Sequence, residues 1–415
     1  MAGPAPACSF KRLQHPEYEA MKAECEPWLL ALAAPPSAAA VRFWQDSSLP
    51  LLGSFFFAQC SKKRAVLGTK MLSWFTVSDT ADDDLSVRGS AVAEHVDRRH
   101  DLILACFAGK PLDHHTLAQL PGGADISREF SSLQEIWKGI SEDMPLAMQA
   151  RYRDAVSRYL HALRVQAQYR NAHSLPGVDE YLNVVRRPAS IVLQLLVLLE
   201  YGLGIELDEA TLGSELLLRL QDAVVGHIAL YNDLFSYEAE MCGGDYFNLP
   251  SVILRESRAA QPGFTLADAV EETVRMVEEV DKQCAELMEE VEKSRLMEKA
   301  GVERYLRGLG TFMAGNAEWS SKTGRYTHTC SSEGVVLPVV RMRRTSSLLL
   351  LPASPRPYLG PTSLMHVMIT PEHRFVPGFI TLSDTHKRVS LHAPKFNRVS
   401  LLHSSRLHTS MPLYI

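Results

Sequence analysis

The sequence has 415 residues, 46% of them hydrophobic and 22% charged, so it can bury a large core in one or two domains. Residues 331–415 carry three acids and ten Lys/Arg, a net charge of +7, which leaves −12 for residues 1–330. This acidic body is not typical of a nucleic-acid-binding protein, and it suits a pocket that collects cations.

No apolar run reaches the length of a membrane span, and the N-terminus has neither the charged start nor the apolar stretch of a signal peptide. The seven cysteines are scattered and never form a C-x-x-C pair. Their pattern argues against a disulfide framework or a zinc site and favours a reducing compartment. We therefore predict a cytoplasmic protein without stable membrane insertion.

Helical signals follow one another from residue 15 to about residue 320, and strand signals are almost absent. Pro35-Pro36 ends the first segment, and an apolar stretch containing Phe55, Phe56 and Phe57 follows. The later predicted helices are 65–84, 89–107, 127–140, 145–171, 181–202, 209–240, 267–299 and 302–319. Segment 181–202 is apolar nearly all round and should be central, with Pro188 kinking it or marking its start. The pattern predicts an all-α bundle around one cavity.

A column of oxygen-bearing side chains ends the segment 209–240. Asn232, Ser236 and Glu240 are spaced i, i+4 and i+8, so on a helix they share one face over two turns. An amide oxygen, a hydroxyl and a carboxylate are hard donors of the kind that Mg²⁺ prefers. The alternative for any such trio is a polar helix end that meets solvent.

Four acids gather at the end of the predicted helix 65–84: Asp79, Asp82, Asp83 and Asp84. Asp79 and Asp83 are spaced i, i+4, and without a cation their repulsion costs stability. Two Mg²⁺ ions that share these carboxylates would remove the penalty and bridge to a diphosphate. The alternative is a solvated acidic helix end.

Two further cationic segments carry candidate site residues. Arg186 and Arg187 adjoin a very apolar segment and are not expected to be buried without an anion, and guanidinium groups match phosphate oxygens in bidentate geometry. The alternative is an ordinary cation pair at a helix end. Arg325-Tyr326, preceded by Trp319, carries almost no information by itself, and a surface position is its default.

Taken together, these segments resemble the motifs of class I terpene synthases, most of all the fungal, basidiomycete-type sesquiterpene synthases. The stretch Asn232-Asp-Leu-Phe-Ser236-Tyr-Glu-Ala-Glu240 resembles the second metal-binding motif, and Asp79-Thr-Ala-Asp-Asp83 resembles the aspartate-rich motif. Arg186 lies 46 residues before Asn232, the usual offset of the family's diphosphate-sensing arginine. The closing motif of the family is similar to Trp319-Ser-Ser-Lys-Thr-Gly-Arg325-Tyr326. The resemblance spans residues 15–330.

The chain departs from the family pattern at three places. Thr80 stands where the second acid of the aspartate-rich motif is usual, which leaves open whether Asp82 or Asp83 completes that site. Ala189 and Ser190 replace a small pair with glycine that often follows the sensor arginine. Ala239 replaces a lysine that helps to hold the diphosphate in many relatives.

The resemblance implies an architecture and a set of roles. Residues 15–330 would form a single class I terpenoid synthase α-helical bundle around a central cavity. The residue pattern itself predicts that segment 1–14 is disordered and that the basic tail 331–415, which lacks a helical period, is disordered or a gene-model artefact. Metal would be bound from one side by Asp79 and Asp83 and from the other by Asn232, Ser236 and Glu240. The remaining implied residues are Arg186, Arg325 and Tyr326 on the diphosphate and Phe75 and Trp319 on the cavity wall.

The implied activity is ionisation of farnesyl diphosphate and cyclisation of the carbocation to a sesquiterpene, with release of diphosphate. The implied cofactor is Mg²⁺, as three ions, with Mn²⁺ as an alternative. The implied partner is a small prenyl diphosphate, with no nucleic acid, and the protein would be a monomer or a homodimer. Two alternatives stay open: a monoterpene or prenyl diphosphate enzyme of the same fold, or a catalytically impaired α-helical relative. The sequence does not give the product, because cavity contour decides it.

Overall fold

A computed structural model describes residues 6–86, 93–120 and 124–326, and three short strands further along the chain. Within these ranges, the side chains of residues 81–86, 93–94, 114, 118 and 124 lie outside the description. The chain divides into the units Met1–Ser354 and Pro355–Ile415. The second unit contains the antiparallel strands β1 (Ile380–Thr381), β2 (Val389–Leu391) and β3 (Ser400–Leu401). The assignment of the tail to disorder or to a gene-model artefact stays a prediction.

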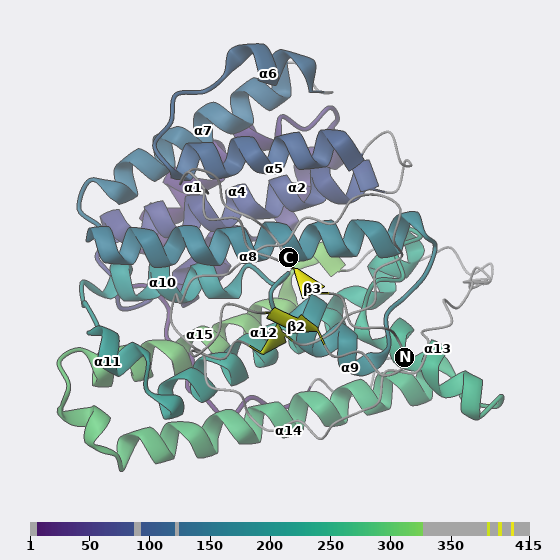
Figure 1. Ribbon diagram of the computed structural model, residues 1–415. Coiled ribbons are helices and arrows are strands. Elements are labelled where there is room, and N and C mark those ends of the chain that lie inside the picture. The colour runs from purple at the N-terminus through teal and green to yellow at the C-terminus, as the bar shows by residue number, and fades with distance from the viewer. Residues whose placement is uncertain are drawn as a thin grey trace. The chain divides into compact units, whose positions relative to one another are not determined.

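The described part of the first unit is helical, as Figure 1 shows, which confirms the predicted all-α class. Its first half contains α1 (Tyr18–Ala33), α2 (Ala38–Asp46), α3 (Leu49–Phe56), α4 (Lys62–Ser86), α5 (Ala93–Phe107), α6 (His114–Gln119), α7 (Ala124–Ser141) and α8 (Leu146–Asn171). Its second half contains α9 (Val178–Glu180), the π-helix η2 (Tyr181–Arg186), α10 (Val192–Leu203), α11 (Glu209–Leu212), α12 (Glu215–Cys242), α13 (Leu249–Ala260), α14 (Leu266–Glu292), α15 (Val302–Lys322) and the 3₁₀ turns η3 (Arg295–Glu298) and η4 (Gly324–Tyr326).

Two segments predicted as single helices are interrupted. Segment 181–202 stops at Arg186 and resumes at Val192, because Pro188 lacks the backbone N–H that a continuous helix needs. Segment 209–240 is divided at Gly213, and Ser214 then caps α12, its hydroxyl accepting a hydrogen bond from the Leu217 amide at 3.4 Å. The first interruption directly follows the predicted site residue Arg186, and the second sets where α12, which carries Asn232, Ser236 and Glu240, begins.

Helix α12 is the element that positions the site. It packs against α10, α13, α14 and α15 (Figure 1), and Leu217, Leu220 and Val224 along it are fully buried. Burial of each such side chain contributes about 1.5–3 kcal/mol. Rotation of α12 would expose this apolar stripe, so the stripe fixes the direction in which the polar column at the other end of the helix points.

Helix α4 delivers the aspartate-rich segment. Met71, Leu72 and Phe75 are buried, and the four acids 79–84 occupy the last two turns before the helix ends at Ser86. The C-terminus of a helix carries a partial negative charge, so acids there are disfavoured unless a cation is near. None of the described helices is long and apolar enough to cross a membrane.

Candidate functional site

The site is centred on the predicted column of α12, and hydrogen bonds connect that column to two other predicted motifs. The side-chain oxygen of Asn232 accepts a hydrogen bond from Nη2 of Arg186 at 2.6 Å. Its side-chain nitrogen donates to the hydroxyl of Tyr326 at 2.8 Å. The structure therefore brings together Arg186, Asn232 and Tyr326, which lie on η2, α12 and η4.

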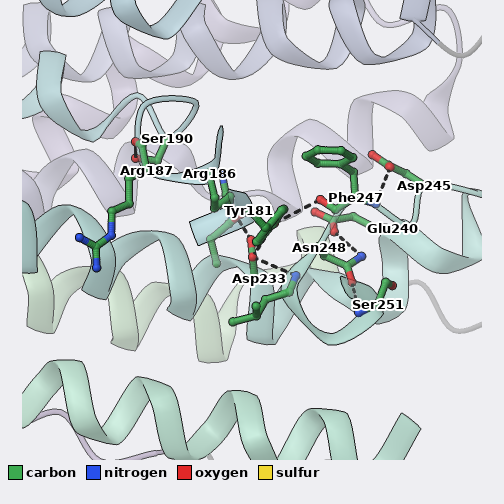
Figure 2. Close-up of polar contacts among 12 residues, drawn as sticks. Tyr181, Arg186, Arg187, Ser190, Asp233, Glu240, Asp245, Phe247, Asn248 and Ser251 are labelled. Atoms are coloured by element: carbon green, nitrogen blue, oxygen red, sulfur yellow. Dashed lines mark hydrogen bonds and ion pairs between the residues drawn. The ribbon is translucent and has the colours of Figure 1, made fainter. Parts of the chain in front are cut away.

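A buried carboxylate that the sequence reasoning did not assign to the site lies beside this chain of contacts. Asp233 is 2% exposed and accepts hydrogen bonds from Nε of Arg186 at 2.7 Å, from the hydroxyl of Tyr181 at 2.7 Å and from the Leu249 amide at 3.1 Å. Figure 2 shows Tyr181 and Arg186 converging on it. Burial by itself would lower the pKa of Arg186, but Asp233, Tyr181 and Glu240 raise it, so this cation is fixed.

Glu240, the last residue of the column, has little positive charge near it to balance its own negative charge. Glu240 accepts a hydrogen bond from Nδ2 of Asn248 at 3.0 Å. Burial, with the nearby carboxylates of Asp245 and Asp233, raises the pKa of Glu240 to about 7. The hydroxyl of Ser236 is near enough to lower that pKa somewhat, yet it has no hydrogen-bond partner of good geometry among the described residues, although it is buried.

The loop after α12 supports Glu240 and begins the next helix. Asn248 uses its side-chain oxygen to cap α13, accepting from the Ser251 amide at 3.1 Å, while its nitrogen binds Glu240. Asp245 accepts from Nη2 of Arg170 on α8 at 2.7 Å. Asn248 and Asp245 are site residues that the sequence reasoning did not assign, although an Asn ahead of Leu-Pro is a recognisable helix start.

The closing turn η4 reaches the aspartate-rich helix as well as α12. Nη2 of Arg325 lies 3.5 Å from the hydroxyl of Thr80 on α4, and its buried Nη1 has no partner among the described residues. The ring of Tyr326 packs edge-on against Trp319, with 5.6 Å between centroids. The indole of Trp319 donates to the Ser47 carbonyl at 2.9 Å, so this aromatic pair is anchored to the end of α2.

Asp79 is the acid of the first motif whose side chain is described. Its Oδ1 accepts a hydrogen bond from the hydroxyl of Tyr159 on α8 at 2.9 Å, and the neighbouring Thr80 hydroxyl donates to the Thr76 carbonyl. The predicted ligand Asp83 belongs to α4, but its side chain and that of Asp82 lie outside the described residues. The choice between Asp82 and Asp83 therefore stays open.

The two adjacent arginines have different environments. Arg187 is not part of the Asp233 group, as Figure 2 shows, and it pairs with Asp222 near the surface. Together with Arg186 it lines a cavity of about 420 Å³ between η2, α12 and α14, with Met276, Glu279 and Lys282 on the opposite wall. This lining carries charges of both signs and contains neither Phe75 nor Trp319, the two residues that the family resemblance places on the cavity wall.

The candidate cavity-wall aromatics are deeply packed. Phe75 is 1% exposed, and its ring lies 5.5 Å from that of Tyr159, which in turn holds Asp79. Phe75 is thus next to the first motif, and Trp319 is next to the closing motif. The roles of Phe75 and Trp319 as cavity walls stay predictions.

Comparisons with known proteins show which family the chain resembles. The family model described as "Terpene synthase family 2, C-terminal metal binding" matches residues 70–283, a range that contains Asp79, Arg186 and the whole α12 column. Microbial Terpene synthase-like protein 13 of Selaginella moellendorffii is 29% identical over 336 residues, which cover 80% of this chain and 87% of that protein. Sesquiterpene synthase Agr3 of Cyclocybe aegerita is 25% identical over 330 residues, covering 77% of this chain and 86% of that protein.

A solved structure shows the same fold. The crystal structure of α-eudesmol synthase matches with a TM-score of 0.62 at 20% sequence identity, covering 77% of this chain and 99% of that chain. The arginine and tyrosine of η4 lie beyond the residues matched by the family model, so their connection to the site rests on the contacts to Thr80 and Asn232.

Proposed function

Because this chain belongs to the terpene synthase family, and is thus a terpene cyclase, we propose that it ionises farnesyl diphosphate and cyclises the resulting carbocation to a sesquiterpene. The family acts on prenyl diphosphates. The observation that carries the proposal is the continuous set of contacts from Arg186 through Asn232 to Tyr326, with Ser236 and Glu240 on the same face of α12. The choice of a farnesyl chain is supported by the resemblance to a basidiomycete sesquiterpene synthase.

The residues present fit a divalent cation of the Mg²⁺ type. The buried Ser236 hydroxyl has no hydrogen-bond partner among the described residues, and burial together with the nearby carboxylates of Asp245 and Asp233 raises the pKa of Glu240. A hard cation would satisfy both groups with oxygen ligands. The oxygen of Asn232 holds Arg186, so its use as a ligand requires Arg186 to move to another anion. A diphosphate oxygen is such an anion.

In this mechanism Mg²⁺, or Mn²⁺, would neutralise negative charge that develops on the departing diphosphate. Arg186, Arg325 and Tyr326 bind diphosphate oxygens with N–H and O–H donors, and donors aimed at developing charge are usually the largest catalytic contribution. Nη1 of Arg325 has no hydrogen-bond partner in the part of the chain that the structure describes, so it can donate to such an oxygen. Phe75 and Trp319 present aromatic faces that stabilise a cation and help to exclude water until it cyclises.

The test is a product assay with matched variants. Purified protein is incubated with geranyl, farnesyl or geranylgeranyl diphosphate and Mg²⁺, and the volatile products are analysed. We expect cyclic C15 products from farnesyl diphosphate. Glu240→Gln should abolish turnover with an unchanged circular dichroism spectrum, and Glu238→Gln, an exposed acid on the same helix, should keep it.

Three outcomes would contradict the proposal in different ways. Products only from geranyl or geranylgeranyl diphosphate would change the substrate, and no product from any of them would indicate a catalytically impaired relative. Full activity of Glu240→Gln would remove the α12 column from the mechanism. The cytoplasmic location and the monomeric or dimeric state stay predictions.

A further inference from the structure

A second group of potential metal ligands lies on α12, outside the site described above. Cys8 of the N-terminal segment, His227 of α12 and Asp281 of α14 each offer one ligand atom, and these atoms all lie within 4.8 Å of one another. His227 and Asp281 are 0% and 4% exposed, whereas Cys8 is only partly buried. Among the described residues, these three form the only group in which a thiol sulfur, an imidazole nitrogen and a carboxylate oxygen lie this close together.

The group is held together by specific contacts. Nε2 of His227 lies 3.0 Å from Oδ1 of Asp281, and the backbone amide of Ser9 donates to Oδ2 of Asp281 at 3.1 Å. The Ser9 hydroxyl donates to the same carboxylate. Nδ1 of His227 has no partner among the described residues, although the side chain is fully buried. Nε2 therefore faces the carboxylate, and Nδ1 is a buried polar atom for which the described residues supply no partner.

Aromatic packing fixes the orientation of the imidazole. The ring of Tyr231 stacks on His227 with 4.7 Å between centroids, and Phe10 meets it edge-on at 6.3 Å. The hydroxyl of Tyr231 also donates to the Pro6 carbonyl at 3.2 Å. Residues 6–10 are therefore positioned against α12 and α14 from both sides of Cys8, and the thiol cannot move away without breaking these contacts.

The protonation states of two members already suit metal binding. Burial lowers the pKa of His227, so its imidazole is neutral. Burial opposes ionisation of Asp281, but hydrogen bonds from His227 and Ser9 lower its pKa below the usual value, so it is a carboxylate. Burial raises the pKa of the Cys8 thiol to about 12, and Asp281 adds to this effect. A bound cation removes this last obstacle, because it stabilises the thiolate.

We propose that Cys8, His227 and Asp281 form a zinc site that fastens the N-terminal segment to α12 and α14, with water as the fourth ligand. One thiolate and one carboxylate balance the charge of one divalent ion, so the loaded site is neutral in a buried setting. Sulfur and imidazole donors select Zn²⁺ over Mg²⁺, which prefers oxygen ligands. This site therefore binds a different class of ion from the Asn232, Ser236 and Glu240 column.

The proposed site would be an exception to one expectation from the sequence. The absence of a C-x-x-C pair argued against zinc, but these three ligands lie on segments separated by more than 50 residues at each step. Spacing motifs detect only sites whose ligands are close in sequence. His227 lies five residues before Asn232 on the same helix, so the ion would act structurally at the other face of the helix that carries the Mg²⁺-type column.

The test uses Co²⁺ as a spectroscopic substitute for Zn²⁺ on the full-length, chelator-treated protein. We expect one equivalent to bind with the intense absorption band of a sulfur-to-cobalt charge transfer, and one equivalent of Zn²⁺ to displace it. Cys8→Ser should remove the band and weaken binding by at least about 100-fold, the upper range for loss of groups that support a metal site. Cys60→Ser, which removes another partly buried thiol, should leave the band unchanged.

Two further measurements separate this proposal from its alternatives. Zn²⁺ should protect residues 6–14 from proteolysis in wild-type protein and not in Cys8→Ser. Glu240→Gln should keep the cobalt band. The cobalt experiment therefore tests the zinc site whether or not the proposed cyclase activity is found. The absence of a thiolate band in folded wild-type protein, or its persistence in Cys8→Ser, would overturn the zinc site and leave a hydrogen-bonded cluster.

Discussion

The carboxylate of Asp233 accepts hydrogen bonds from three places in the chain: Tyr181 and Arg186 on η2, and the Leu249 amide at the start of α13. On the same helix, Asp222 pairs with Arg187 near the surface. The two Asp–Arg pairs involve adjacent arginines but differ in burial. They therefore allow a matched comparison of how much a buried and an exposed ion pair contribute to the free energy of unfolding.

We predict that Asp233→Asn lowers the free energy of unfolding by about 3 kcal/mol, because it leaves Arg186 buried without a counter-charge. Asp222→Asn should cost about 0–1 kcal/mol, since exposed pairs are screened by solvent. Urea unfolding of both variants measures the difference. Equal losses would show that Asp233 does not hold the buried arginine in the way described.

Glu240 gives a prediction about pH. Its pKa of about 7 lies above the ordinary value of 4.5, so between these values the folded protein keeps a proton that the unfolded chain releases. Without metal, stability should therefore fall as pH rises through this window. A metal ligand must be deprotonated, so Mg²⁺ affinity should rise with pH up to about 7 and then level off.

Calorimetric titration of Mg²⁺ in two buffers with different ionisation enthalpies counts the protons released. We expect release below pH 7 in the wild type and a much smaller release in Glu240→Gln, with Glu238→Gln behaving like the wild type. A pH-independent affinity in the wild type would mean that Glu240 is not the titrating ligand.

At the scale of elements, the short turn η4 joins two long helices. Arg325 contacts Thr80 on α4, and Tyr326 contacts Asn232 on α12, so three residues of backbone connect the two metal motifs. Helix α8 adds a second connection on the α4 side, because its Tyr159 binds Asp79. These contacts fix the position of Asp79 on α4 relative to α12.

The end of α4 supplies the next prediction. Asp79→Asn should lower kcat by at least about 100-fold, a loss typical of removing one group that stabilises developing charge. Asp84→Asn should have a clearly smaller effect, because Asp79 begins the i, i+4 pair with Asp83. Steady-state kinetics at saturating Mg²⁺, with circular dichroism as a folding control, measures both. Equal and mild effects would mean that the wrong acids were chosen.

The sequence predicted the all-α class and the position of Asn232, Ser236 and Glu240 on one helix, because both depend on local periodicity. The metal-binding role of that column stays a prediction. The sequence did not predict α13 (Leu249–Ala260). It could not predict the π-helix η2. In an α-helix Tyr181 and Arg186 would point about 140° apart, whereas the wider π turn brings residues i and i+5 to one side, where both contact Asp233. Asn248 and Cys8 were missed for another reason: their partners are set by tertiary packing, which a single sequence does not encode locally.

On the scale of the whole molecule, the site contains acids on one set of elements and arginines on another. Asp79, Glu240 and their neighbours need cations, while Arg186 and Arg325 need an anion. A metal–diphosphate complex supplies both, so each component should bind better with the other.

We therefore predict that Mg²⁺ and diphosphate together raise Tm by more than the sum of their separate effects. Thermal unfolding of the full chain, with each component alone and with both, measures this. Arg325→Ala should fold and lose most of the excess, whereas Arg307→Ala, an exposed arginine on α15, should keep it. Strict additivity, or full stabilisation by diphosphate without metal, would count against a shared metal cluster.

The contact between Ser9 and Asp281 has a consequence for how the protein is made. The two residues are separated by 272 positions, and Arg12 similarly reaches Glu318 on α15. At roughly 5–20 residues per second, a ribosome adds the partner of Ser9 only some tens of seconds after Ser9 itself. During that interval the start of the nascent chain has no docking surface. The closing pair Arg325-Tyr326 is translated later still, so under the role proposed for these residues a polypeptide released early would lack two of its diphosphate contacts. Under the proposed function, a chain would therefore acquire its full set of diphosphate contacts only with the last turn of the bundle.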